Sequence, residues 1–403
     1  MIGSKRPRFQ PMVEGSSVTQ LELFFDLVLV FAFTMVTAIA ATPTSAQNIL
    51  RSLLVLAVMW WAWIAYSWLA NTVRADEGIT RVAMFVAMGG AFIAALTIPE
   101  AFQDAPGGWS GPLVFALAYL VVRLVHLGVY LMGTGDDPAL RAQVGKWGIG
   151  SIGIGTTLLI IAAMTHGTVQ IGLWIAAIAG DMLWTMVAGL QWRVRSPRHF
   201  SERYGLIIIV ALGESIVSIG IGVSGQPISW PITVGSLLGL AVSGLLWWSY
   251  FDVAALSAEH ALARATGERQ VRIARDGYTY WHFPMIVGII GLSLGLKKVL
   301  SYVSDATHHS LTDALYGIPL YALYGGVVLY LTGLVGFKYA ATGRITRSHL
   351  VAVVVLLALV APATALPALA ALAVLCAVLI ALVGWDTVRD ARGREQIRHA
   401  HGS

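Results

Sequence analysis

Residues 18–41 read VTQLELFFDLVLVFAFTMVTAIAA, and this stretch decides the fold class. It contains no Lys or Arg, and its only ionisable side chains are those of Glu22 and Asp26. A helix that spans a bilayer needs roughly 20 mostly apolar residues, so the stretch predicts a membrane-spanning helix. Because Glu22 and Asp26 are four positions apart, their carboxyl groups lie on one face of that helix.

The rest of the chain repeats this apolar pattern. Of its 403 residues, 57% are hydrophobic and only 12% are Asp, Glu, Lys or Arg, whereas a soluble domain carries about 25% charged residues. This composition excludes a soluble enzyme, a disordered protein and a nucleic-acid-binding domain, and strand-like alternation is absent. The sequence therefore predicts an all-α polytopic membrane protein with about 12 transmembrane helices. These runs lie near residues 18–41, 50–70, 80–99, 111–132, 147–165, 168–190, 203–222, 231–255, 278–297, 314–337, 348–363 and 366–386.

The basic residues indicate the orientation of the spans, because cytoplasmic loops carry an excess of Lys and Arg. If the amino terminus is inside, all but four of the 26 Lys and Arg residues fall on the inner side. Arg51, Lys297 and Lys298 lie outside and Arg123 lies within a span, while Arg203 falls in the inner segment before span seven. Both termini are therefore predicted to be cytoplasmic, in a multi-pass protein of the cell (inner) membrane. The positive charge marks topology, so the expected partner is the lipid bilayer and no nucleic acid.

Neither a metal site nor a cofactor is expected. The single cysteine, Cys376, cannot form an internal disulfide or a cysteine metal cluster. His308 and His309 are adjacent in sequence, and the chain has no His-x-x-x-His or Cys-x-x-Cys spacing.

An internal repeat is suggested by two similarities between the halves of the chain. Span one begins Glu22-Leu-Phe-Phe-Asp26-Leu-Val-Leu-Val, and span seven begins Glu202-Arg203-Tyr-Gly-Leu-Ile-Ile-Ile-Val. Spans two and eight share a double tryptophan at residues 60–61 and 247–248. Six spans per half give both halves one orientation, which predicts a parallel 6+6 repeat; chance similarity between apolar helices is the alternative. The first six-helix half is residues 1–190. The second half starts with residues 191–277, which include a cytoplasmic linker helix at 256–277. It continues over residues 278–403, which end in a basic C-terminal tail.

Three ionisable residues are expected near the middle of the bilayer. Arg123, Asp181 and Glu214 lie about 13–15 Å from the inner ends of spans four, six and seven, at 1.5 Å per residue. An ionisable group in hydrocarbon is costly and normally faces a cavity or a partner. One cation and two acids at one depth therefore predict a mutually paired cluster.

A second group is expected nearer the cytoplasm. Asp26, His126 and His282 lie about 6–12 Å from the inner boundary, and Glu22 lies one turn below Asp26. His126 shares one helix face with Arg123, at the spacing i+3. The two groups taken together favour a polar pathway, although each residue has a structural alternative, because buried ion pairs also fix helix register.

Four short motifs resemble the bacterial low-temperature-requirement A family. They are Glu22-Leu-Phe-Phe-Asp26-Leu-Val, Glu202-Arg203-Tyr-Gly-Leu-Ile, Leu212-Gly-Glu214-Ser and His282-Phe-Pro284. The resemblance runs by motif from about Val18 to His282. It implies a many-spanning inner-membrane protein in which Glu22, Asp26, Glu202, Arg203, Glu214 and His282 matter, with Glu202 and Arg203 as an interface motif, and it implies no mechanism. A fainter likeness to two-repeat endolysosomal potassium channels rests on Phe24-Phe25-Asp26, but span seven lacks the aspartate.

The leading hypothesis is a transporter or channel-like permease with a polar intramembrane pathway. Arg123 would pair with an anionic or zwitterionic substrate, and a carboxylate would carry a coupling proton. The alternatives are a membrane-embedded enzyme acting on a lipid or isoprenoid-like substrate and a structural membrane protein. No catalytic residue is assigned, the ligand is an unidentified small molecule, ion or lipid, and a homo-oligomer is left open. The pathway residues are Glu22, Asp26, Arg123, His126, Asp181, Glu214 and His282.

Overall fold

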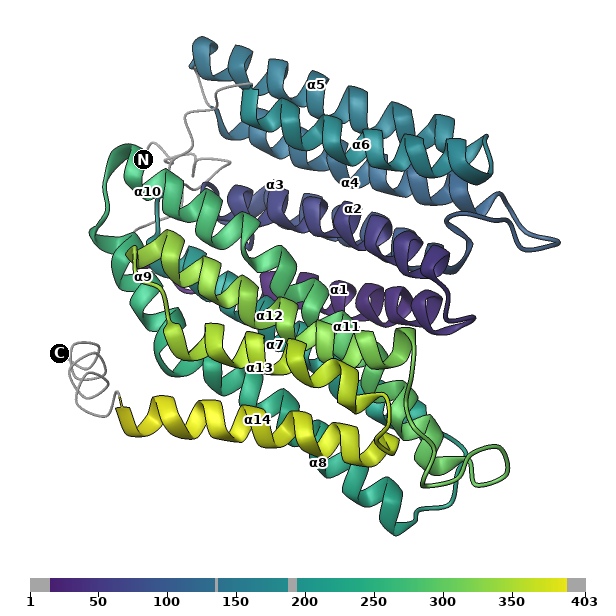
Figure 1. Cartoon of the computed structure of the whole chain (residues 1–403). Helices are drawn as coiled ribbons and strands as arrows, with labels where there is room; N and C mark the ends of the chain where they lie inside the picture. The colour runs from purple at the N-terminus through teal and green to yellow at the C-terminus, as the bar shows by residue number, and fades with distance from the viewer. Residues whose placement is uncertain (1–14, 135–136, 188–193, 390–403) are drawn as a thin grey trace. The chain divides into compact units, whose positions relative to one another are not determined.

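The structure is a computed structural model that describes residues 15–134, 137–187 and 194–389. Lys5, Arg6 and Arg8, then Arg193, and the basic tail at 390–403 lie outside these described residues. The described residues form helices and contain no β-strand. The helices are α1 (Gln20–Ala41), α2 (Ala46–Ala70), α3 (Gly78–Leu96), α4 (Gly111–Gly133), α5 (Pro138–Ala163), α6 (Gly167–Val187), α7 (Pro197–Gly222), α8 (Trp230–Ser249), α9 (Ala255–Arg264), α10 (Gly267–Arg272), α11 (His282–Ser304), α12 (Ile318–Thr342), α13 (Arg347–Ala363) and α14 (Ala368–Arg389) (Figure 1).

The helices confirm the polytopic membrane prediction. Eleven helical stretches in the described part of the chain are long and apolar enough to cross a membrane. Two of them join consecutive helices, Trp230–Arg264 and Gly267–Ser304. Each of the twelve apolar runs overlaps a helix in the described residues, but α13, at 17 residues, is shorter than the eleven.

The chain divides into two compact units, which are described separately. The first unit comprises Met1–Ile39 and Ile49–Arg203, and the second comprises Ala40–Asn48 and Tyr204–Ser403. The helices α1, α2 and α7 each pass from one unit into the other. The first two turns of α7, up to Arg203, therefore belong with the body of α1 in the first unit.

In the first unit α2 is the most enclosed helix. It buries Trp60, Trp63, Tyr66 and Trp68 along its length. The helices α3, α4, α5 and α6 pack as successive neighbours, and Figure 1 shows α4, α5 and α6 side by side. The buried aromatic side chains of α2 thus form part of the core of the first unit, and the polar side chains described below pack against them.

In the second unit the closest pair is α11 and α12. A Cβ atom placed on Gly326 of α12 would lie 2.6 Å from the backbone oxygen of Gly288 in α11. Only a residue without a side chain allows such an approach of two helix backbones. The same unit packs α12 against α13, α13 against α14, and α14 against α8.

Two π-helical segments interrupt the second unit. They are η2 (Tyr250–Ala254), between α8 and α9, and η3 (Ile273–Tyr280), between α10 and α11. Where the sequence predicts one linker helix over residues 256–277, the structure has α9 and α10, separated at Ala265, whose backbone is extended. Gly267 begins α10 with φ of +59°, a conformation that favours glycine. The charged stretch therefore begins with two short helices, α9 and α10, and does not form one continuous helix.

Candidate functional site

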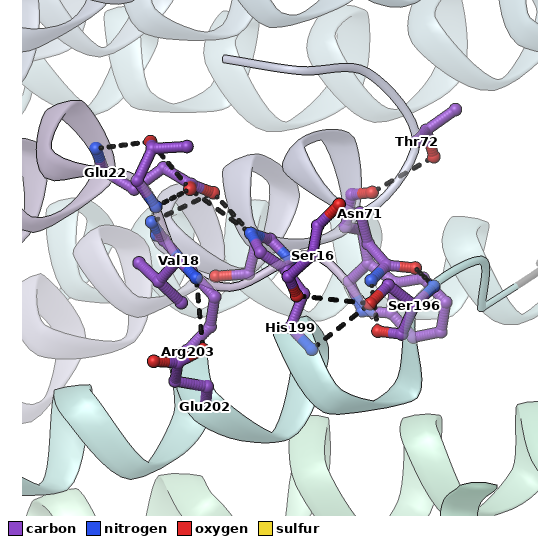
Figure 2. A network of polar contacts seen from close by, with 12 residues as sticks. Ser16, Val18, Glu22, Asn71, Thr72, Ser196, His199, Glu202 and Arg203 are labelled. Atoms are coloured by element: carbon purple, nitrogen blue, oxygen red, sulfur yellow. Dashed lines mark hydrogen bonds and ion pairs between the residues drawn. The ribbon is translucent and has the colours of Figure 1, made fainter. Parts of the chain in front are cut away.

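The start of α7 is fixed by a side chain from the end of α2. The buried Asn71 Oδ1 accepts hydrogen bonds from the backbone N–H groups of Arg195 (2.7 Å) and Ser196 (3.4 Å), and its Nδ2 donates to Ser196 O (2.7 Å). Ser196 Oγ in turn accepts from the backbone N–H of His199 at 3.4 Å, and Pro197 opens the helix (Figure 2). Ser before Pro is a strong helix start signal. The helix begins at residue 197, six residues before the predicted start of span seven, and this places two polar side chains inside it.

Those two side chains, His199 and Arg203, meet the two acids of α1. His199 Nε2 lies 2.9 Å from Glu22 Oε1, and Arg203 Nη2 lies 3.1 Å from Asp26 Oδ1. Each pair is separated by the same 177 positions. A constant offset means that the two helix segments run in the same direction, so an acidic i,i+4 pair faces a basic i,i+4 pair. We call these four residues the charge ladder.

Further contacts hold the acidic side of the charge ladder. Thr19 and Glu22 form a reciprocal capping box, in which the Thr19 N–H donates to Glu22 Oε2 (2.8 Å) and the Glu22 N–H donates to Thr19 Oγ1 (3.3 Å). Trp63 Nε1 donates to Asp26 Oδ1 at 2.9 Å. The Arg203 guanidinium lies 5.6 Å from the centre of the Trp63 ring, at cation–π distance. The ladder is thus held by α1, α2 and α7.

The charges of the ladder do not balance when the histidine is neutral. All four side chains are buried, with at most 2% of each side chain exposed. Two carboxylates and one guanidinium sum to −1, and one added proton makes the sum zero. Asp26 Oδ2 and His199 Nδ1 are buried without a hydrogen-bond partner among the described residues. An uncompensated buried charge is costly, so this imbalance is the feature of the ladder that an account of its function has to explain.

A pocket lies next to the start of α1, the helix that carries Glu22 and Asp26 of the charge ladder. It has a volume of about 850 Å³ and is lined by residues 16–21, Phe24, Arg74, Asp76, Arg81 and Phe85. Thr19 lines this pocket and also donates its hydroxyl to Glu22 at 2.8 Å. Thr19 therefore links the lining of the pocket to Glu22 of the charge ladder.

The structure brings two of the three expected midplane residues together. Arg123 Nη2 of α4 lies 3.2 Å from Asp181 Oδ2 of α6, and both side chains are buried. Ser151 of α5 contacts both of them through its hydroxyl group. Glu214, the third member, belongs to the second unit, where Ser218 donates to it at 2.9 Å.

His126 lies among aromatic rings. Its ring centre is 5.5 Å from that of Tyr66 and 5.9 Å from that of Tyr130. The Tyr66 hydroxyl donates to the backbone oxygen of Val122, one turn before His126, at 2.8 Å. His126 is buried with Arg123 on the same face of α4, as the spacing predicts.

His282 connects the two π-helical segments of the second unit. Its Nδ1 lies 3.3 Å from the backbone oxygen of Gly277 in η3, and its Nε2 lies 2.8 Å from the hydroxyl of Tyr250 in η2. A carbonyl oxygen only accepts, so Nδ1 donates to Gly277. In the neutral ring, Nε2 then accepts from the Tyr250 hydroxyl. His282 thus joins η2 and η3 through its two ring nitrogens.

Arg203, which the sequence counts with the basic inner segment before span seven, is not a solvated loop residue. Its side chain is 1% exposed and is paired with two acids of α1. Its neighbour Glu202 does face outward, and Glu202 Oε2 accepts from the backbone N–H of Val18 at 3.1 Å.

Sequence reasoning missed four contributing residues. His199 carries a usable signal, since it precedes Arg203 by four positions just as Glu22 precedes Asp26. Asn71, Trp63 and Ser151 have no local signal, because each acts on a partner that is distant in sequence.

Comparison with known proteins gives the family of the chain. Residues 17–384 match the family described as Bacterial low temperature requirement A protein (LtrA). An uncharacterized protein of Rhizobium meliloti (strain 1021) is 26% identical over 356 residues, covering 84% of this chain and 81% of the relative. No solved structure matches the chain. Since the family match covers nearly the whole chain and eleven helical stretches are fit to cross a bilayer, the protein is a multi-pass membrane protein that belongs to the LtrA family.

Proposed function

We propose that the protein is a proton-coupled transporter or channel-like permease in which the charge ladder carries the coupling proton. The observation that supports this proposal is the charge imbalance of Glu22, Asp26, His199 and Arg203, which are buried together. One proton neutralises the ladder. A group that gains and loses a proton at such a site changes its pairing, and this is the change that a proton-coupled carrier needs.

The Arg123–Asp181 pair is the proposed contact for the transported solute. Arg123 holds a positive charge within the first unit and is paired with the carboxylate of Asp181, 3.2 Å away. An anionic or zwitterionic solute with a carboxylate of its own can replace Asp181 on the guanidinium at similar geometry. Ser151, which contacts both partners, supplies a hydroxyl for either arrangement.

The parallel 6+6 repeat and the cytoplasmic termini are part of this proposal. The constant offset of 177 positions in the charge ladder means that α1 and the first turns of α7 point the same way. The first and seventh spans of a parallel six-span repeat must share one direction. The direction of the two helices supports the repeat, and the excess of basic residues on one side supports the inner location of both termini.

A current measurement on reconstituted protein tests the proposal. Proteoliposomes are adsorbed on a solid-supported membrane and exposed to anionic, zwitterionic and cationic solutes under an inward proton gradient. Wild-type protein is expected to give a solute-dependent current that Asp26→Asn reduces by about tenfold or more, since this change removes the acid without changing its size. Glu268→Gln is the matched control, because Glu268 is 86% exposed. A current that Asp26→Asn leaves at the wild-type level would remove the charge ladder from the transport path.

The alternative of a membrane-embedded enzyme acting on a lipid or isoprenoid-like substrate stays a prediction. Within the described part of the chain, no group of three or more His, Cys, Asp and Glu side chains is arranged to hold a metal ion.

A further inference from the structure

A second cluster of charge lies in the second unit, at the ends of several helices. A pocket of about 720 Å³ is formed where α9 and α10 meet, where α12 ends and α13 begins, and where α14 ends. Six of the residues that line it are basic. They are Arg264, Arg269, Lys338, Arg344, Arg347 and Arg389.

The pocket has almost no negative charge to offset these cations. Asp386 is the one carboxylate among the residues given as its lining, and it lies 3.5 Å from the ring of His349. Among the described residues, none of the five arginines of the pocket has a carboxylate within 4.0 Å. Elsewhere in the chain, Arg74, Arg272 and Arg275 each pair with an acid at 3.4 Å or less. Five other described arginines also have no carboxylate within 4.0 Å, namely Arg51, Arg81, Arg141, Arg195 and Arg198. The pocket arginines are distinguished because they lack an acidic partner among the described residues and also converge on one surface.

Membrane topology explains the sign of these charges but not their convergence. Basic residues scattered over the inner loops satisfy the orientation rule equally well. Here, segments from residue 264 to residue 389 bring six of them to one concave surface. Gly343 contributes, because its φ of +70° ends α12 and turns the chain so that Arg344 and Arg347 line the pocket with Lys338. Gathering like charges in this way is unfavourable unless an anion lies among them.

The chemistry of the lining identifies the class of anion. Guanidinium groups bind phosphate through paired N–H donors, and clusters of arginine are typical of phosphate recognition. A volume of about 720 Å³ falls in the range of sites that hold a small organic ligand. All five arginines that line the pocket are exposed, so a ligand in solution or at the membrane surface can reach them.

We propose that this pocket binds a ligand with two or more phosphate charges, either a soluble polyphosphorylated compound or the headgroup of an anionic phospholipid. The site lies wholly within the second unit and shares no residue with the charge ladder. The proposal therefore stands whether or not the protein is a transporter.

The test measures binding to the full chain in nanodiscs. The pocket variant carries Arg344→Gln and Arg347→Gln, and the control variant carries Arg141→Gln and Lys146→Gln. All four residues are exposed, and the control pair lies on α5 in the first unit, so each variant loses two positive charges. In one arm, tripolyphosphate is titrated calorimetrically into protein in phosphatidylcholine nanodiscs. In the other arm, native mass spectrometry counts the phosphatidylglycerol and cardiolipin molecules retained by protein from mixed-lipid nanodiscs.

Either of two results supports the phosphate site, and each identifies whether its ligand is a soluble compound or a lipid headgroup. Tripolyphosphate binding that the pocket variant weakens by about tenfold or more, and the control variant does not, indicates a soluble ligand. Retention of anionic lipid that the pocket variant alone reduces, without tripolyphosphate binding, indicates a lipid headgroup. The proposal is overturned if the pocket and control variants behave alike in both arms.

Discussion

At the scale of the residue, Arg203 is the side chain on which the charge ladder depends. It lies 3.5 Å from Glu22 and 3.1 Å from Asp26, and its ring partner Trp63 also holds Asp26. It is the fixed positive charge of the four residues. Without it, two carboxylates remain on one face of α1 with only a histidine to balance them.

Replacing Arg203 is therefore expected to destabilise the protein strongly. Breaking a buried ion pair by removing one partner costs about 3–5 kcal/mol, so Arg203→Gln should lower the free energy of unfolding by that order. Thermal unfolding in detergent measures the loss. Adding Glu22→Gln should recover part of it, because this second change removes one of the stranded carboxylates. Equal losses in the single and double variants would contradict the pairing.

The acidic half of the ladder is predictable from the sequence, and the basic half is not. Glu22 and Asp26 stand out because they interrupt an apolar run of 24 residues at i,i+4 spacing. Arg203 looks like one more basic residue at the inner end of a span. Its burial depends on where α7 starts, and that start is set by Asn71, 124 and 125 positions away from the backbone groups it binds. A contact over that sequence distance leaves no local pattern to read.

At the scale of the element, glycines decide how closely α11 and α12 approach. Gly288 of α11 and Gly326 of α12 face each other, so that a Cβ atom on either would meet backbone atoms of the other helix at 2.5–2.6 Å. Backbone atoms cannot move aside as a flexible side chain can. The adjacent Gly325 has no atom within 4 Å of its Cβ position.

Two neighbouring substitutions on α12 should consequently have opposite effects. Gly326→Ala forces the helices apart and is expected to cost about 1–3 kcal/mol. Gly325→Ala adds a methyl group in open space and should stabilise the helix by up to about 1 kcal/mol. Melting curves of the two variants in the same detergent compare them directly. Equal melting temperatures would show that the two helices do not pack through Gly326.

The sequence predicts the helices better than it predicts their irregularities. Each apolar run overlaps a helix, because a run of this length has few other ways to satisfy its backbone in a membrane. The π-helical turns at Tyr250–Ala254 and Ile273–Tyr280 have no such signature. His282, which bonds a carbonyl group five positions earlier, contacts both of these segments.

At the scale of the whole molecule, the predicted topology is open to a labelling test. Residues 42–49 are expected outside and residues 343–346 inside. In a Cys376→Ala background, a membrane-impermeant maleimide should label Gln47→Cys in intact cells. It should label Ile345→Cys, whose parent side chain is 56% exposed, only after the cells are permeabilised. The reverse pattern would place the basic loops outside and contradict the orientation.

The central claim concerns the proton that the charge ladder is proposed to carry. Its most direct test is the internal pH of proteoliposomes loaded with pyranine, recorded while the solute that gives the largest current is added under a membrane potential. Wild-type protein and the control Glu268→Gln are expected to move protons with the solute, because the ladder alternates between a net charge of −1 and zero. Asp26→Asn is expected to reduce proton movement to the level of protein-free vesicles. Proton movement in Asp26→Asn equal to that of the wild type would contradict the claim.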